Sequence, residues 1–290
     1  MNPAPRASYT IPLPGGRALA LGPRTLVMGI LNVTPDSFAD LAPGLDPRAA
    51  IDRALAMEAD GADLIDIGGE STRPGADPVS EDEERRRVIP VIEALAGRLS
   101  VPLSIDTYKA GVAAAALDAG AVVVNDISGL SYDPGLGELV AARGAAIVLM
   151  HMRGRPKAMY QEAVYDVVGR DVPRELSGSI ARAVAAGIAF ERIVLDPGIG
   201  FAKRPEHSFR ALASLAGLAA LDRPVLVGPS RKSFLSRAIG PAEPAAREWA
   251  TAGAVAAAVM LGAHIVRVHN VAAMRDVVRV VDAIVAEHGV

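Results

Sequence analysis

The segment at residues 230–233 places two cations, Arg231 and Lys232, between two hydroxyls, directly after an apolar run and Gly228-Pro229. We expect this segment to open a helix. Cations at a helix N-terminus oppose the helix dipole, which favours anions there, so a purely structural role does not account for them. Backbone N–H groups, the Lys232 ammonium and the hydroxyls are expected to converge on an acidic or acceptor-rich ligand.

Further cations follow other apolar runs. Arg267 and His269 flank Val268, and residues two apart in a strand point to the same face, so both can reach one ligand. Arg73 adds a third cation in a Gly-rich loop. These groups together predict a polyanionic ligand such as phosphate or pyrophosphate.

Hydrogen-bond acceptors stand at the ends of three more runs, as Asp106, Asn125 and Asp196. Buried acids need donors, and a ligand with a donor-rich edge, such as a 2-aminopyrimidinone, would supply them. Cations and acceptors together predict a flat, amide-like head with a phosphate tail. Segments 66–70 and 196–200 are each also consistent with ordinary turn chemistry when taken alone.

The chain contains eight short apolar runs, and each is followed by Gly, Pro, Asn, Asp, Arg or His. If these runs are parallel strands, the residues that follow them lie together at one edge. A buried parallel strand is a continuous apolar run, and the active site of a β/α barrel lies at one rim of such strands. Eight units favour an α/β fold of the (β/α)8 barrel type over a doubly wound open sheet, the competing fold. The predicted strands are 26–31, 64–67, 102–105, 122–124, 145–149, 193–195, 225–227 and 265–268.

Helices are predicted between the strands. A capping box at residues 80–83 marks the start of one helix, and the stretch after residue 149 is longer and less regular, up to about 186. The other helices are predicted from about 46, 109 and 205, after 134, between 231 and 261, and over 272–287. Residues 1–24 predict a hairpin that closes the barrel bottom, and 1–290 are expected to form a single domain.

Composition excludes several classes of function. Net charge is −3 with no long basic run, so no nucleic-acid partner is expected. The Ala-rich tract at 252–261 is too short to span a bilayer, so no membrane partner is expected either. The chain has no cysteine, which excludes disulfides and thiolate sites and suits a reducing, cytoplasmic compartment.

Across essentially its whole length the chain resembles the dihydropteroate synthase family. The matching segments are 28–38 (MGILNVTPDSF), 66–76 (DIGGESTRPGA), 104–109 (SIDTYK), 124–126, 149–154 (LMHMRG), 195–203 (LDPGIGFAK), 230–234 (SRKSF) and 267–271 (RVHNV). The resemblance implies a TIM barrel that joins p-aminobenzoate to 6-hydroxymethyl-7,8-dihydropterin pyrophosphate and requires Mg²⁺. It also implies a homodimer formed through helices of the later barrel units.

The resemblance assigns roles to individual residues. The pterin would be held by Asp106, Asn125, Asp196 and Lys232, with Met150 and Arg267 on its faces. The diphosphate would be gripped by Arg73, Arg267 and His269, and Asn32 would bind Mg²⁺ together with diphosphate oxygens. The p-aminobenzoate site would be formed by Thr72, Pro74, Phe201 and Ser233. The groups expected to act in catalysis are Arg73, Lys232, Arg267 and His269.

Several positions depart from the family pattern: Ala202 and Ala250 replace glycines, Ser208 and Asn270 replace the usual Asn and Asp, and 39–41 differ in the first loop. Three other functions remain open. They are a pterin-dependent methyltransferase domain, a non-catalytic pterin-binding paralogue, and a phosphate-binding barrel with another substrate. A methyltransferase domain would not need the cations that bind pyrophosphate. A phosphate-binding barrel with another substrate would not need Asp106, Asn125 and Asp196 together.

Overall fold

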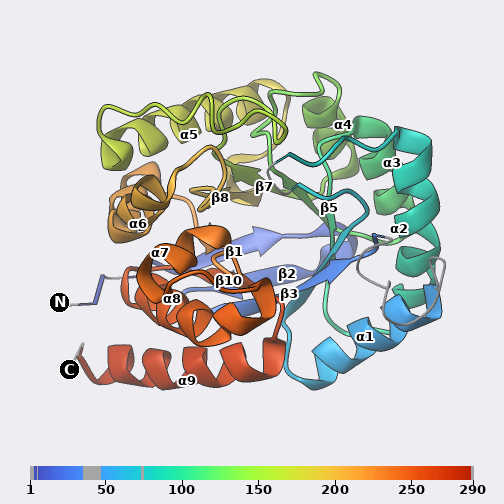
Figure 1. Cartoon of the computed structure of the whole chain (residues 1–290). Helices are drawn as coiled ribbons and strands as arrows, with labels where there is room; N and C mark the ends of the chain where they lie inside the picture. Colours follow the sequence, from blue (N-terminus) through green and yellow to red (C-terminus); the bar gives the residue numbers. More distant parts are fainter. Residues whose placement is uncertain (1–2, 5, 35–46, 73–74, 289–290) are drawn as a thin grey trace.

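Eight parallel strands surrounded by helices form the centre of the computed structural model, which describes residues 3–4, 6–34, 47–72 and 75–288 (Figure 1). The barrel strands are β3 (Leu26–Asn32), β4 (Leu64–Gly68), β5 (Leu103–Asp106), β6 (Val123–Asp126), β7 (Ala146–Met150), β8 (Ile193–Asp196), β9 (Leu226–Val227) and β10 (Ile265–Val268). Each coincides with a predicted strand to within two residues at either end.

The sheet closes on itself. Its hydrogen-bonded strand order is β8-β7-β6-β5-β4-β3-β10-β9. A parallel bridge between Leu195 of β8 and Val225, next to β9, joins the two edge strands. Closure confirms the TIM barrel and makes the doubly wound open sheet wrong.

Helices follow the strands in alternation, as predicted. They are α1 (Pro47–Ala59), α2 (Glu81–Leu95), α3 (Ala110–Ala119), α4 (Leu136–Arg143), α5 (Val168–Ala185), α6 (Pro205–Ala213), α7 (Ser236–Ile239), α8 (Glu248–Met260) and α9 (Val271–His288). Ser80 caps α2, with its Oγ accepting from the Glu83 N–H at 3.3 Å. The stretch after β7 is irregular only to residue 167, and α5 then runs for 18 residues. No helix in the described ranges is long and apolar enough to cross a membrane.

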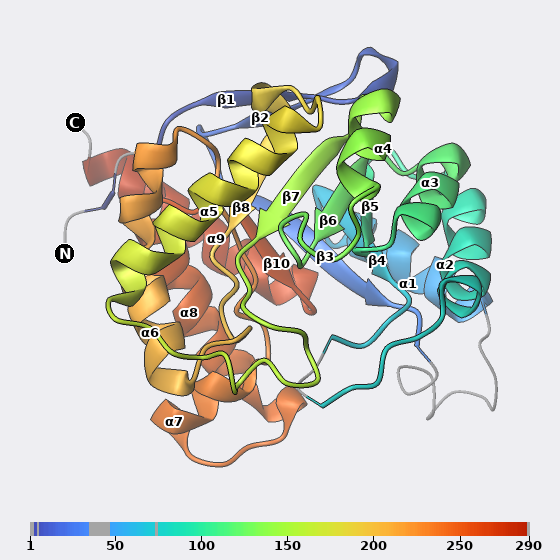
Figure 2. The ribbon, with the colours of Figure 1, turned by 90° about the horizontal axis from the view of Figure 1, so that it is seen from above.

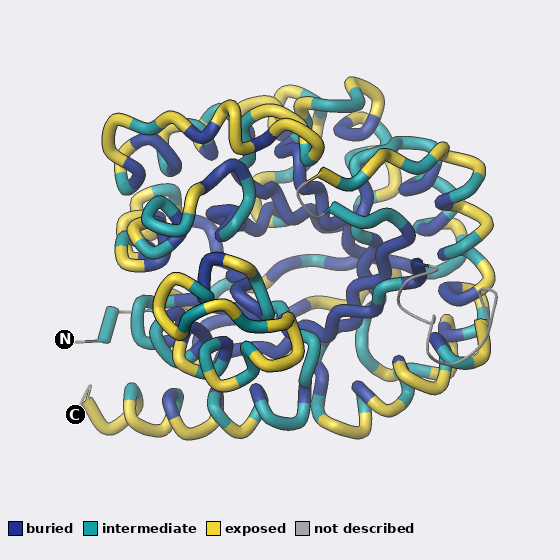
Figure 3. Tube along the Cα trace, viewed as in Figure 1, coloured by how far each residue is buried: buried dark blue, intermediate teal, exposed yellow. Residues whose placement is uncertain are grey.

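Side chains along each strand alternate between two environments. Outward residues such as Val27 and Ile65 pack against the helices in the larger core. Inward residues near the strand starts, such as Leu26 and Leu64, form a second core inside the barrel. Figure 3 shows this strand region as largely buried. The alternation decides which polar residues further along the strands face the barrel mouth.

The N-terminal hairpin closes the bottom of the barrel, as predicted. Its strands β1 (Tyr9–Pro12) and β2 (Ala18–Leu21) pair antiparallel. Ile11 and Leu21 belong to the second core, with residues from the starts of the barrel strands. Figure 2 shows the hairpin across one end of the barrel, opposite the long connection from β7 to α5. The mouth therefore lies at the carboxyl ends of the strands.

The loop after β8 is tightly constrained at Gly198. Its φ of 66° lies in the left-handed region, and an added Cβ would lie 2.0 Å from the His151 carbonyl oxygen. Gly198 N donates to Asp196 Oδ1 at 2.7 Å. Glycine thus allows the loop to pass close to β7 and to hold the carboxylate that ends β8.

We expect Gly198→Ala to lower the free energy of unfolding by at least about 3 kcal/mol, because left-handed strain adds to a backbone clash. Urea unfolding measures this change. Gly217→Ala is the matched control, since nothing lies within 4 Å of its added Cβ, and its effect should stay below about 1 kcal/mol. Equal stability of the Gly198→Ala and wild-type proteins would contradict the constraint.

Candidate active site

Arg267 of β10 reaches across the barrel mouth to acids on two other strands. Its Nε donates to Asp66 Oδ2 at 2.6 Å, and its Nη2 donates to Asp106 Oδ2 at 2.7 Å. The Asp66 side chain is fully buried, and the other two are largely buried. Burying these charges is tolerated because they are paired and hydrogen-bonded. The two acids therefore fix the position of the guanidinium.

Asp66 also holds Asn125, a residue predicted to bind the pterin. The Asn125 Nδ2 donates to Asp66 Oδ2 at 2.8 Å. Among the described residues, the buried Asp66 Oδ1 has no hydrogen-bond partner. Asp66 is not among the predicted site residues, because residues 66–70 are consistent with an ordinary turn. Its position two residues after inward-facing Leu64 was the signal that could have identified it.

Burial shifts the proton equilibria of the site toward neutral pH. It raises the pKa of Asp106 to about 7. The negative charge of Asp66 adds to this rise, and the positive charge of Arg267 opposes it. Burial also raises the pKa of Asp196, which the charge of Lys232 opposes. Burial lowers the pKa of Lys232 to about 8, with Asp196 acting in the opposite direction. Titratable groups perturbed in this way are typical of functional sites.

Lys232 connects the pterin ligands with the predicted p-aminobenzoate site. Its Nζ donates to the Ile199 carbonyl oxygen and lies 4.3 Å from the centre of the Phe201 ring. Its charge also acts on Asp196 at the end of β8. One ammonium thus acts on a buried acid and contacts an aromatic ring, and these two groups belong to the two predicted substrate sites.

Arg231, one of the two cations in residues 230–233, bonds within the protein. The Arg231 guanidinium is paired with Glu248, with 2.9 Å between Nε and Oε2, and its N–H donates to Thr251 Oγ1 at 3.0 Å. Arg231 has a backbone φ of 58°, in the left-handed region, so the chain turns between Arg231 and Lys232. The segment opens a 3-10 turn at 233–235 and the four-residue helix α7, in place of a long helix.

Ser230 has a positioning role toward His269. Its Oγ lies 2.9 Å from His269 Nδ1 and accepts from the His269 N–H at 3.2 Å. The hydroxyl thus holds the imidazole predicted to contact the diphosphate, at the end of β10.

The other predicted site residues lie at the same rim. Asn32 ends β3 and is half-buried, whereas Met150 ends β7, is buried and pairs in register with Asp196. Thr72 is half-buried after β4, and Ser233 is exposed at the start of its 3-10 turn. Arg73 and Pro74 lie outside the described residues.

Asn32 fits a magnesium site that is held mainly by substrate. Mg²⁺ prefers oxygen ligands, keeps several waters and binds through substrate phosphates. The Asn32 carboxamide offers one such oxygen at the carboxyl end of β3. Among the described residues, no group of three acidic or His side chains could hold a metal by itself. The Asn32 carboxamide oxygen is one ligand of the kind that a metal–diphosphate complex would use.

A buried lysine that the sequence analysis did not select, Lys203, lies behind the site. Its Nζ lies 2.8 Å from His151 Nδ1 and donates to the Phe201 carbonyl oxygen at 3.2 Å. Both residues belong to quoted motifs, but their burial and their contact could not be predicted from spacing.

Three of the positions that depart from the family pattern have a defined backbone conformation or hydrogen bond in the structure. Ala202 has a φ of 46°, a conformation that favours the glycine usual there. Asn270 Oδ1 accepts from the Ala273 N–H at 3.2 Å, the capping bond an Asp would make. Ser208 is buried, and its hydroxyl bonds to the Arg204 carbonyl oxygen. Nothing in the structure explains Ala250, and 39–41 lie outside the described residues.

Known proteins resemble this chain over nearly its whole length. The sequence profile of the family described as pterin binding enzyme matches residues 28–269. The dihydropteroate synthase of Synechocystis sp. is 46% identical over 275 residues, which cover 94% of this chain and 95% of that protein.

Solved structures resemble the whole fold. The Xanthomonas albilineans dihydropteroate synthase with 4-aminobenzoic acid has a TM-score of 0.89 and 42% identity, covering 96% of this chain and 98% of that one. The same enzyme in complex with 7,8-dihydropteroate has a TM-score of 0.83 and 41% identity, covering 93% and 96%. The profile match and these identities show that the chain belongs to the dihydropteroate synthase family of pterin-binding enzymes.

Proposed function

We propose that this chain condenses 6-hydroxymethyl-7,8-dihydropterin pyrophosphate with p-aminobenzoate, forming 7,8-dihydropteroate and pyrophosphate. The observation that supports this proposal is the set of buried and partly buried polar groups at the barrel mouth. Asn125 and Asp196 are buried, and Asp106, Lys232 and the paired Arg267 are partly buried. A relative that is 46% identical to the chain is named dihydropteroate synthase. A similar solved structure of such an enzyme contains 7,8-dihydropteroate.

The pterin occupies the inner part of the mouth in this proposal. Asp106 and Asp196 accept hydrogen bonds from its donor-rich edge, and Asn125 both donates and accepts. Met150 and Arg267 pack against its faces. The pterin donors would thereby satisfy carboxylates whose burial is otherwise costly.

The reaction begins when the pterin CH₂–O bond ionises, which leaves a cation delocalised into the ring and a free diphosphate. Arg73, Arg267 and His269 stabilise the departing negative charge. Asn32 would hold Mg²⁺ together with diphosphate oxygens, and the bound metal would supply further positive charge to the leaving group. The amine of p-aminobenzoate, held by Thr72, Pro74, Phe201 and Ser233, then forms the C–N bond and loses a proton.

We also propose a cytoplasmic homodimer. Trp249 at the start of α8 is 88% exposed, and Val280 and Ile284, one turn apart on α9, are exposed as well. Val280 and Ile284 together give α9 an exposed apolar strip, and such surfaces are typical of interaction sites. A solution mass equal to one 30.0 kDa chain would contradict the dimer.

The lack of cysteine supports the proposed location in the reducing cytoplasm.

The reaction is tested with purified protein, Mg²⁺, the dihydropterin pyrophosphate and labelled p-aminobenzoate, with chromatography for dihydropteroate. We expect product, and we expect EDTA to abolish it and excess Mg²⁺ to restore it. Pterin binding without product would contradict the proposal. A methyl-folate assay would then separate the methyltransferase from a non-catalytic paralogue.

Asp196→Asn should weaken pterin binding by about ten- to a hundredfold, because a charged hydrogen-bond acceptor becomes neutral at unchanged shape. Calorimetry with the dihydropterin measures this loss. Asp118→Asn, at an exposed ion pair on α3, is the control and should bind normally. Unchanged affinity in Asp196→Asn would remove Asp196 from the pterin pocket.

Pterin binding should also weaken as pH falls below about 7, the pKa of Asp106. The ionised carboxylate binds the donors, so Kd should rise by about tenfold per pH unit below that pKa, with one proton released on binding at pH 6. Calorimetry in two buffers with 6-hydroxymethyl-7,8-dihydropterin, which has no titrating phosphate, measures both. Asp106→Asn should abolish this dependence, and its persistence would assign it to another group.

A further inference from the structure

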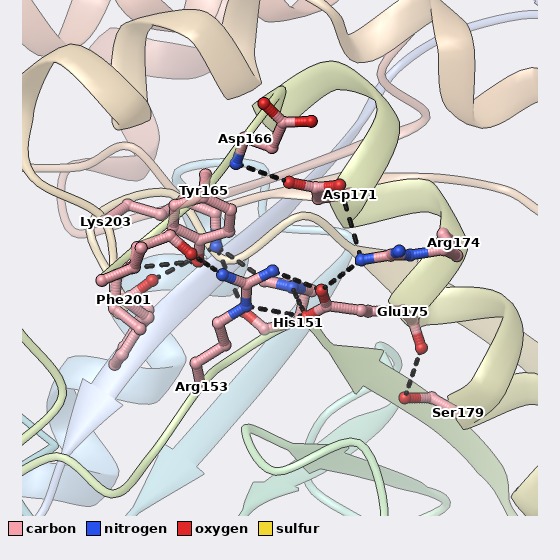
Figure 4. Close-up of polar contacts among 12 residues, drawn as sticks. His151, Arg153, Tyr165, Asp166, Asp171, Arg174, Glu175, Ser179, Phe201 and Lys203 are labelled. Carbon is pink, nitrogen blue, oxygen red and sulfur yellow. Dashed lines mark hydrogen bonds and ion pairs between the residues drawn. The ribbon is translucent and has the colours of Figure 1, made fainter. Parts of the chain in front are cut away.

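Lys203 is only 1% exposed, and the proposed reaction gives it no role. Figure 4 shows it beside His151 and Phe201. Its Nζ lies 2.8 Å from His151 Nδ1, 3.2 Å from the Phe201 carbonyl oxygen and 3.4 Å from the His151 carbonyl oxygen. An ammonium has three donors, so these three acceptors satisfy it completely.

His151 connects this lysine to Glu175 on α5. Its Nε2 lies 2.9 Å from Glu175 Oε2, which also accepts from Arg153 Nε at 3.0 Å. Burial lowers the pKa of His151 to about 4, so the ring is neutral at neutral pH. A carboxylate only accepts, so the ring proton lies on Nε2 and leaves Nδ1 as acceptor for Lys203. We call these three residues, Glu175, His151 and Lys203, the lysine network.

The lysine network ends at the backbone of Phe201. Lys203 holds the Phe201 carbonyl oxygen, and the Phe201 N–H donates to the Gly198 carbonyl oxygen at 3.0 Å. Lys232 lies over the Phe201 ring from another loop. Lys203 thus holds the Phe201 carbonyl oxygen, whereas Lys232 contacts the Phe201 ring.

Burying an ammonium at this position has a cost that an apolar side chain of similar length would avoid. Burial lowers the pKa of Lys203 to about 7, with the charge of Asp196 opposing the shift. The predicted pterin ligands have hydrogen bonds of their own: Asn125 bonds to Asp66, and Asp196 accepts from the Gly198 N–H. The charge of Lys203 also acts on Asp196, but no hydrogen bond joins the two side chains. Of the two residues that accept hydrogen bonds from Lys203, Phe201 is the predicted substrate contact.

We propose that Lys203 is a positioning residue for the p-aminobenzoate half of the site, acting by fixing the Phe201 carbonyl and hence the ring that contacts the aryl amine. His151 and Glu175 hold the ammonium for this task. The inference rests on the proposed function, in which Phe201 binds p-aminobenzoate.

Lys203→Met tests this role, because it removes the three hydrogen bonds at similar side-chain length. We expect KM for p-aminobenzoate to rise by about tenfold or more, with Kd for 6-hydroxymethyl-7,8-dihydropterin within about twofold of wild type. Lys157→Met, at an exposed lysine paired with Asp77, is the matched control and should change neither value. Equal losses for both ligands would overturn the proposal in favour of a general structural role.

A double-mutant cycle gives a second readout. Phe201→Ala should raise KM for p-aminobenzoate, and adding Lys203→Met should raise it by less than about twofold more, since both act through one ring. Multiplicative effects of the two substitutions would show that Lys203 acts elsewhere.

Glu175→Met provides a variant at a more exposed position, should Lys203→Met fail to fold. It removes the acceptor for His151 Nε2 and should raise KM for p-aminobenzoate in the same direction, by a smaller factor, with pterin affinity retained. An unchanged KM would contradict the lysine network. Wild-type turnover in the same series tests the proposed function separately, and a wild type that forms no dihydropteroate would overturn both.

Discussion

Closing eight short strands into a ring forces every second residue into the barrel, and this constraint positions the whole site. Near the strand starts the inward residues are apolar, as at Leu64 and Ile265, and they pack onto the hairpin. Two residues later the same faces carry Asp66 and Arg267. The site is therefore the continuation of the inner core, and its groups are held by the backbone of the sheet.

Burial at the mouth then makes charge compensation decisive. Arg267 is the common partner of Asp66 and Asp106, and Lys232 acts on Asp196. Each pair joins different strands or loops, so the charges stabilise one another only in the closed barrel. Because desolvation brings the pKa values of Asp106 and Lys232 close to neutrality, ligand binding and proton binding are coupled in this site.

The loop after β8 joins the two halves of the site. Gly198 lets it pass beside the His151 carbonyl, and the His151 N–H donates to the Asp196 carbonyl oxygen at 2.8 Å. Phe201 follows three residues later with its carbonyl on Lys203. One loop thus carries the acid proposed to bind the pterin at one end and the ring proposed to contact the aryl amine at the other, which would favour a fixed distance between the two substrates.

The local pattern of apolar and polar residues was enough to predict the strands, most of the helices, the closing hairpin and the polar rim. Each strand or helix shows its own spacing of apolar residues, which can be seen within a short stretch of sequence. The motifs also identified the family and the residues placed at the mouth. Pairing across the barrel was decided by the tertiary structure. Asp66 meets Arg267 over 201 residues of sequence, and Lys203 meets His151 over 52. Arg231 turns to Glu248, although spacing grouped it with Lys232. Closure brings such groups together, and the need to satisfy buried charge selects their partners.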